Sequence, residues 1–102
     1  MCGIAGFTGP ANQSLLSRMI GALQYRGPDD EGCWVGDSVS FGMRRLSIVD
    51  IKLGTQPVFN ETGDIVAVFN GEIFNYIELR KQLEKRGHHF KSHHSDSETI
   101  VH

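Results

Sequence analysis

The sequence predicts an α+β fold, in which antiparallel strand pairs are combined with amphipathic helices. Two observations favour this class. Short strand-like segments follow one another across tight turns that are rich in glycine, asparagine and aspartate, the usual connections of antiparallel hairpins. Two other segments repeat their apolar residues at the three-to-four-residue spacing of a helix. With 102 residues, of which 39% are hydrophobic and 22% charged, the chain can form one small globular domain.

The chain is expected to begin with a strand and a helix. Residues 3–8 (GIAGFT) are apolar and small, which is typical of a buried strand that another backbone approaches closely. A helix should follow a cap at Asn12 or Ser14, because apolar residues then recur at helical spacing. We expect this helix to end near Tyr25, where the turn-rich segment RGPDDEG begins.

Two hairpins are expected next. Residues 33–35 (CWV) and 38–49 (SVSFGMRRLSIV) flank a tight Gly-Asp turn and should pair with each other. A loop, DIKLGTQP, separates them from residues 58–59 and 64–71, which flank the turn segment NETG and should form a second antiparallel pair.

A second helix is expected over residues 76–86 (YIELRKQLEKR). Asn75 and Glu78 have the spacing of a capping box, and Gly87 is suited to end the helix. Its apolar stripe should consist of Ile77, Leu79 and Leu83.

The last segments are a short strand over residues 88–92 and the start of a further helix at residues 95–98, capped by Ser95 or Asp96. The sequence stops three or four residues into that helix, which would be marginal by itself. We therefore expect the chain to be the first part of a larger domain.

Charge and composition exclude several classes of function. A net charge of −2 gives no electrostatic reason to expect nucleic acid or an anionic membrane as partner. There is no signal-peptide pattern, and no apolar run approaches the roughly 18 residues of a membrane span. Cys2 and Cys33 make no disulfide framework, and two reduced thiols indicate a cytoplasmic protein. We interpret Cys33, beside Trp34, as a structural strand residue.

The cysteine at position 2 is the first candidate for chemistry. If Met1 is removed, Cys2 carries both a thiol and a free α-amine, and an N-terminal amine can act as the base for its own side chain. An α-amino group ordinarily has a pKa of about 7.7–8.0, which leaves it partly neutral at cellular pH. It could therefore accept the thiol proton and later deliver a proton to a leaving group.

Four further segments carry polar residues in loops or at strand ends: RGPDDEG, RRLSIVD, NGEIFNY and SDSE. Each has an ordinary structural interpretation. Arg45 could be a solvated strand end, Asn70 and Gly71 a type I′ turn, and Asp96 a helix cap.

Taken in this order, however, these segments resemble the N-terminal glutaminase domain of class II glutamine amidotransferases, and within that class the glutamine-hydrolysing asparagine synthetases. The resemblance covers residues 1–102. It implies an N-terminal-nucleophile hydrolase fold, an αββα sandwich of antiparallel sheets that this chain contains only in part. Tyr25 and Met43 depart from the family, which often has histidine at both positions.

The resemblance also implies a role for individual residues. Cys2 matches the catalytic nucleophile, and Asn70 and Gly71 match the oxyanion hole. Arg45 matches the residue that binds the α-carboxylate of glutamine, and Asp96 the one that pairs with its α-ammonium. The rest of the glutamine pocket would be lined by Leu46, Ser47, Ile48, Val49 and Glu72.

In such an enzyme, ATP and Mg²⁺ belong to a C-terminal synthetase domain that is absent from this sequence and that transfers the ammonia to aspartate. An amidotransferase acting on another carboxylate acceptor is the alternative. For this chain by itself we expect no useful glutaminase activity, because Met1 blocks the amine of Cys2. It should either self-associate through open sheet edges, for instance as a homodimer, or be stable only within a longer protein.

Two other classes of function compete with this interpretation. A metal-binding module could use His88, His89, His93 and His94, but adjacent residues on a strand face opposite sides, so we expect no metal site. A non-catalytic relative would not need Cys2, Arg45, Asn70, Gly71 and Asp96 together.

Overall fold

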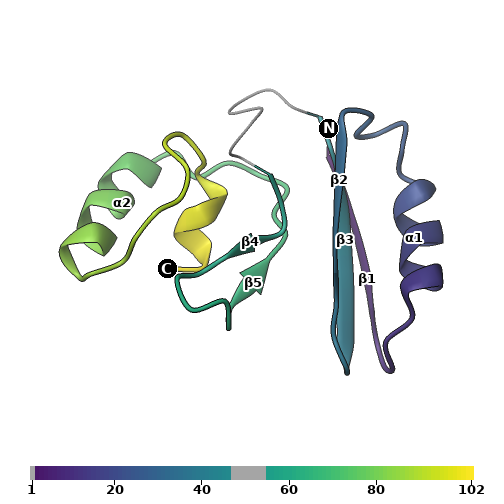
Figure 1. Ribbon diagram of the computed structural model, residues 1–102. Coiled ribbons are helices and arrows are strands. Elements are labelled where there is room, and N and C mark those ends of the chain that lie inside the picture. Colours follow the sequence, from purple (N-terminus) through teal and green to yellow (C-terminus); the bar gives the residue numbers. More distant parts are fainter. Residues whose placement is uncertain (1, 47–54) are drawn as a thin grey trace.

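The computed structural model describes residues 2–46 and 55–102. Its first unit is a three-stranded antiparallel sheet (Figure 1). The strands are β1 (Gly3–Thr8), β2 (Asp30–Val35) and β3 (Val39–Arg45), in the order β1-β3-β2. The β2–β3 hairpin and the first strand are confirmed, but β1 is not the buried strand that was expected, since only its first residue is buried and Ile4 is 50% exposed. Ser47, Ile48 and Val49, which the sequence placed on the same strand as β3, lie outside the described residues.

Helix α1 (Gln13–Gly21) covers one face of this sheet (Figure 1). The Asn12 side chain accepts a hydrogen bond from the backbone N–H of Leu15 at 3.0 Å, which selects Asn12 over Ser14 as the cap. Leu16 and Ile20 are fully buried against the strands. Residues four apart lie on the same face of a helix, so both side chains point from α1 toward the sheet.

The first helix is shorter than expected. It ends at Gly21 rather than near Tyr25, and residues 22–26 continue as turns in which Leu23 bonds back to Ile20 and Arg26 to Leu23. Tyr25 itself is 82% exposed. The apolar residues keep their helical spacing as far as Leu23, but the backbone of residues 22–26 forms turns and does not continue the helix.

The second unit lies on the other side of the sheet from α1 (Figure 1). It consists of the hairpin β4 (Val58–Phe59) and β5 (Val66–Ala67), helix α2 (Tyr76–Lys85) and a short 3₁₀ helix, η1 (Ser97–Ile100). The predicted second hairpin is confirmed, since Val58 pairs with Ala67 and Phe59 with Val66. Gly63 allows its tight turn with φ of 77°.

Several details of the second unit differ from expectation. Asn75 precedes α2, but its side chain makes no capping hydrogen bond, so the capping box is wrong. None of the residues of α2 is buried, and Ile77 is 55% exposed. The strand predicted over residues 88–92 does not form. Gly87 does end α2, with φ of 95° and the N–H of His88 bonded to the carbonyl of Leu83.

Side chains alternate across a strand, so neighbouring residues at the end of β3 face opposite sides of the sheet. A Cβ at Gly42 would meet the Ile20 side chain, which assigns that side to α1. Arg45 and Cys2 therefore belong to the opposite side, toward the second unit. The two units approach closely there, since a Cβ on Gly32 would lie 1.8 Å from the carbonyl oxygen of Gln56. Within residues 2–46 and 55–102, none of the helices has the length and apolar character that a membrane crossing requires.

Candidate active site

The principal cavity, of about 550 Å³, lies between the strand ends of the first unit and the loops of the second. This volume lies within the usual range of small-molecule sites. Every predicted site residue that the structure describes lines it: Cys2, Arg45, Leu46, Asn70, Gly71, Glu72 and Asp96. The three other predicted residues, Ser47, Ile48 and Val49, lie outside the described residues.

Cys2 precedes β1 and is half-buried at the cavity wall. Its Sγ accepts a hydrogen bond from the backbone N–H of Leu46 at 3.4 Å. Its carbonyl oxygen accepts one from Asn70 Nδ2 at 3.1 Å. The thiol is therefore held at the end of β3, and the backbone of Cys2 is tied to the loop that follows β5.

Cys33 has a different environment. It lies on β2, as expected, but its side chain is exposed rather than packed. Partial burial and then the nearby negative charge of Glu31 raise the pKa of Cys33 above its ordinary value. A raised thiol pKa lowers the fraction of reactive thiolate, so Cys33 is less nucleophilic than a cysteine of ordinary pKa.

Asn70 and Gly71 do not form the type I′ turn that their composition allows. A type I′ turn requires positive φ at both central residues, and Gly71 is not among the glycines with positive φ. They belong to the connection between β5 and α2. Gln56 holds this connection, because its Nε2 donates to the carbonyl of Phe69 at 2.9 Å and its Oε1 accepts from the Phe69 N–H at 2.6 Å.

The adjacent arginines at the end of β3 differ in what they contact. Arg44 Nε donates to the carbonyl of Gly27 at 2.8 Å, and its Nη1 forms an ion pair with Glu31 at 2.7 Å. Arg45, which is 8% exposed, lines the cavity. Adjacent residues on a strand point to opposite sides of the sheet, so Arg44 bonds to Gly27 and Glu31 while Arg45 faces the candidate site.

The segment RGPD packs directly on the backbone of these arginines. The N–H of Asp29 donates to the carbonyl of Arg45 at 3.1 Å. A Cβ on Gly27 would lie 2.3–2.5 Å from backbone atoms of Arg44 and Arg45, so only glycine fits. This segment therefore fixes the strand end that presents Arg45, a role that its turn-rich composition alone did not reveal.

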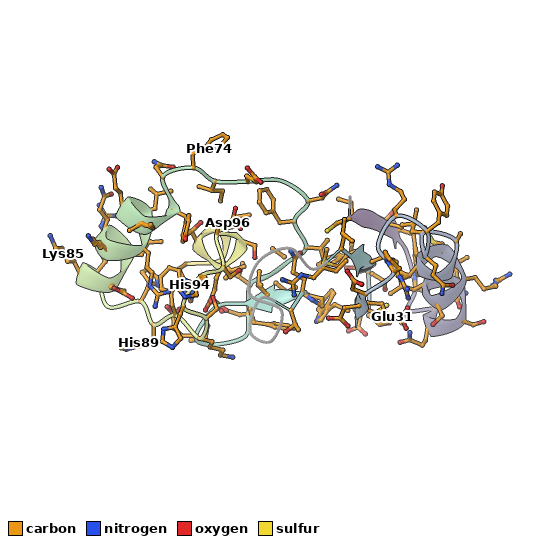
Figure 2. All side chains as sticks on the ribbon, turned by 90° about the horizontal axis from the view of Figure 1, so that it is seen from above. Glu31, Phe74, Lys85, His89, His94 and Asp96 are labelled. Atoms are coloured by element: carbon orange, nitrogen blue, oxygen red, sulfur yellow. The ribbon has the colours of Figure 1, made fainter. Side chains whose placement is uncertain are left out.

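Asp96 precedes η1 but does not cap it with its side chain. Its Oδ2 instead accepts the backbone N–H of Ile73 at 2.8 Å, which ties the start of η1 to the loop carrying Asn70 and Gly71. Figure 2 shows Asp96 beside η1, whereas Phe74, in the same loop, projects away from the molecule and is 92% exposed. The carboxylate thus belongs to the cavity wall.

Sequence reasoning missed Gln56, Tyr76 and His94, which also line the cavity. Gln56 is positioned by its hydrogen bonds to Phe69, and no local pattern marks it. Tyr76 ends the segment NGEIFNY, but sequence reasoning assigned this residue no role. His94 was grouped with its neighbours as part of a four-histidine metal module. The structure does not bring those four residues together. Among the described residues, the group spaced to hold a metal ion is Glu61, His88 and His102.

Comparison with known proteins identifies relatives of the whole chain. A family profile described as a glutamine amidotransferase domain matches residues 1–102. Asparagine synthetase [glutamine-hydrolyzing] 2 of Bacillus subtilis is 47% identical over 109 residues, covering 100% of this chain and 14% of the relative. Asparagine synthetase [glutamine-hydrolyzing] 1 of the same organism is 41% identical, covering 99% and 17%. The Arabidopsis thaliana protein of that name is 38% identical, covering 100% and 18%. The chain thus spans less than a fifth of the length of these relatives.

Proposed function

The chain belongs to the glutamine amidotransferase domain family, and from this premise we propose that it is the glutaminase part of an enzyme similar to the glutamine-hydrolysing asparagine synthetases. The observation that carries the proposal is the convergence of Cys2, Arg45, Asn70 and Asp96 on one cavity. These residues come from separate segments of the chain. They supply a nucleophile, a cation, an amide donor and an anion, which suits the side-chain amide and the two charges of free glutamine.

The first half of the reaction forms a thioester. With Met1 removed, the α-amine of Cys2 takes the thiol proton, and the sulfur adds to the carboxamide carbon of glutamine. The tetrahedral intermediate collapses with cleavage of the C–N bond. The protonated amine transfers its proton to the departing nitrogen, which leaves as ammonia, and the glutamyl group remains on Cys2.

The second half releases glutamate. Water, deprotonated by the same amine, adds to the thioester carbonyl, and the C–S bond breaks as the thiolate takes back the proton. One group thus serves as base and acid in turn, which is possible because its ordinary pKa lies near cellular pH.

Asn70 and Gly71 would stabilise the oxyanion in both steps. An amide nitrogen carries two hydrogens, so Asn70 Nδ2 can hold the carbonyl of Cys2, from which it lies 3.1 Å away, with one hydrogen and donate the other to the substrate. Losing one such donor in well-studied hydrolases costs about 2.7–4 kcal/mol of transition-state stabilisation.

Arg45 and Asp96 would select a free amino acid. A guanidinium offers a planar fork of donors that matches a carboxylate, and a carboxylate pairs with the α-ammonium. Asp96 is already aligned by the N–H of Ile73. Leu46 and Glu72 would complete the described wall. We propose that Ser47, Ile48 and Val49 also line the glutamine pocket.

We further propose that residues 1–102 are the N-terminal part of an αββα glutaminase domain. In the complete protein, a C-terminal synthetase domain would use ATP and Mg²⁺ to transfer the ammonia to aspartate. The short span of the relatives that this chain covers supports this organisation.

The test is product analysis with the full-length protein from which Met1 has been removed. Glutamine, ATP, Mg²⁺ and aspartate should yield glutamate and asparagine. A preparation that retains an N-terminal tag should lose the glutamine-dependent reaction and keep the ammonia-dependent one. Glutamate release without asparagine would keep the glutaminase proposal and assign another carboxylate acceptor. A protein that uses ammonia but never glutamine would contradict the proposal.

A further inference from the structure

A second group of polar side chains lies in the second unit and is not part of the cavity lining. Glu61 comes from the β4–β5 turn, His88 follows α2 and His102 follows η1. One potential ligand atom of each lies within 4.8 Å of the others. Glu61 Oε1 is 2.8 Å from Nδ1 of His88 and 2.7 Å from Nδ1 of His102. Figure 2 shows His89, the neighbour of His88, at the opposite edge from Phe74.

His102 is the central member of this group. Its side chain is 1% exposed, and its Nε2 lies 3.4 Å from Oε1 of the buried Glu98. Ser92 and Lys91 donate hydrogen bonds to the carboxylate of Glu98, which fixes the oxygen that faces His102.

Nδ1 of His102 faces a carboxylate oxygen of Glu61 at 2.7 Å. Nδ1 of His102 is buried and has no hydrogen-bond partner among the described residues, even though Glu61 is so near. The group therefore contains a buried, unsatisfied nitrogen directed toward a carboxylate and a second imidazole.

We propose that Glu61, His88 and His102 form a binding site for one divalent cation of the zinc class, with Oε1 and the two Nδ1 atoms as ligands. Two imidazoles and one carboxylate are an established zinc donor set, which leaves a fourth position for water. Divalent zinc competes well for such nitrogen-rich ligands. Glu98 would act behind His102, because a ligating histidine usually donates its other N–H to a carboxylate.

Metal binding would require the side chains to adjust. Tetrahedral bonds of about 2.0–2.1 Å place ligand atoms about 3.3 Å apart, so the two histidine nitrogens would move away from Glu61 Oε1, from which they now lie 2.7–2.8 Å. The N–H of His89 also donates to Glu61 Oε1 at 2.9 Å and would hold the carboxylate in place.

Metal binding would link three segments of the second unit. Asp96 and Ser97, at the start of η1, line the cavity, whereas Glu98 contacts His102, which belongs to the metal group. A cation would tie the end of this segment to the β4–β5 turn and to the segment after α2. The site would be structural, and it would restrain the short helix that presents Asp96.

The test is titration of the chelator-treated full-length protein with Zn²⁺ by calorimetry, and with Co²⁺ by visible absorption. The expected result is that wild type binds one more equivalent of Zn²⁺ than His88→Ala and shows the intense absorption of four-coordinate Co²⁺. Removing an outer partner alone costs about 10–100-fold in affinity, so loss of a ligand should exceed this range. His93→Ala, an exposed histidine outside the group, is the matched control and should bind as wild type does.

Glu61→Gln provides a second, isosteric variant, in case His88→Ala does not fold. It should also lose the additional equivalent. Equal Zn²⁺ stoichiometry and affinity in wild type and in both variants would overturn the proposal.

Discussion

Asn70 donates a hydrogen bond from its side chain to the carbonyl oxygen of Cys2 at 3.1 Å, although 68 residues separate them in the chain. This bond attaches the loop after β5 to the start of β1. It places an amide donor beside the residue that carries the candidate nucleophile. Motion of either segment would therefore disturb both the nucleophile and the donor that we propose for the oxyanion.

The first prediction concerns the two cysteines. A glutamine-like electrophile should label Cys2 of the full-length protein lacking Met1 and spare Cys33. Only Cys2 can use the α-amine as a base, and the pKa of Cys33 is raised. Peptide mapping by mass spectrometry would locate the label. Cys33→Ala should retain glutaminase activity, whereas Cys2→Ala should abolish it. Label on Cys33 would refute the assignment of the nucleophile.

The second prediction separates substrate binding from transition-state stabilisation. Asp96→Asn removes the charge but keeps an oxygen that can accept the N–H of Ile73. It should raise the KM for glutamine by about 10–100-fold, as expected for loss of a charge-assisted contact of about 1.5–3 kcal/mol. Arg45→Lys should also raise KM, because lysine lacks the planar fork of donors. Steady-state kinetics with glutamine would measure both, with ammonia-dependent synthesis as the check on folding.

The third prediction is that Asn70→Ala lowers kcat by about 100–1000-fold, because an oxyanion donor matters most in the transition state. Asn75→Ala is the control, since the Asn75 side chain makes no capping hydrogen bond. An effect of Asn70→Ala on KM alone would remove Asn70 from the oxyanion hole. In that case its contact with the Cys2 carbonyl would be purely structural.

Local patterns predicted β1 and both hairpins, because turn-forming residues join the paired strands. Gly3 of β1 leaves room for Leu23, whose side chain would lie 3.2 Å from a Cβ there. The failures have a common physical origin. The apolar residues of α2 predicted a buried face, but Leu79 and Leu83 are only half-buried and Ile77 is exposed. Residues 88–92 have strand-like composition but no partner strand, because their backbone instead bonds to Glu98.

The candidate site shows the same division. Family-like motifs predicted which residues would line the cavity, and those described all do. The role of RGPD in holding the end of β3 could not be predicted from spacing, since it depends on a close approach between Gly27 and the arginine backbone. The group of Glu61, His88 and His102 was missed for a similar reason. Glu61 is 27 residues from His88, and only the fold brings them together.

The fourth prediction tests that close approach. Gly27→Ala should destabilise the fold by about 1–3 kcal/mol, the usual cost of overpacking, because its Cβ would contact backbone atoms rather than a movable side chain. Gly21→Ala is the matched control: a Cβ there meets nothing within 4 Å, and alanine favours a helix. Urea denaturation should show a loss for the first variant and little change or a gain for the second. Equal stabilities would contradict the proposed role of RGPD.

The last prediction concerns the turn between β4 and β5. Asn60 is 9% exposed, and its Oδ1 accepts the N–H of Ile65 at 3.1 Å while its Nδ2 donates to Asp64 at 2.7 Å. Asn60→Ala removes both bonds and should lower the free energy of unfolding by about 1–3 kcal/mol. Thermal denaturation would measure the change, with Asn75→Ala as the control.

The same variant should alter the titration of Asp64. Hydrogen bonds from Thr62 and then Asn60 lower the pKa of Asp64 in the folded protein, so their contribution to stability is present above its ordinary pKa and is lost as the pH falls through the lowered value. The stability difference between wild type and Asn60→Ala should therefore shrink in acid. Carboxylate NMR should show the pKa of Asp64 moving up in the variant. A stability difference independent of pH, with an unchanged Asp64 titration, would mean that Asn60 acts only through the backbone of Ile65.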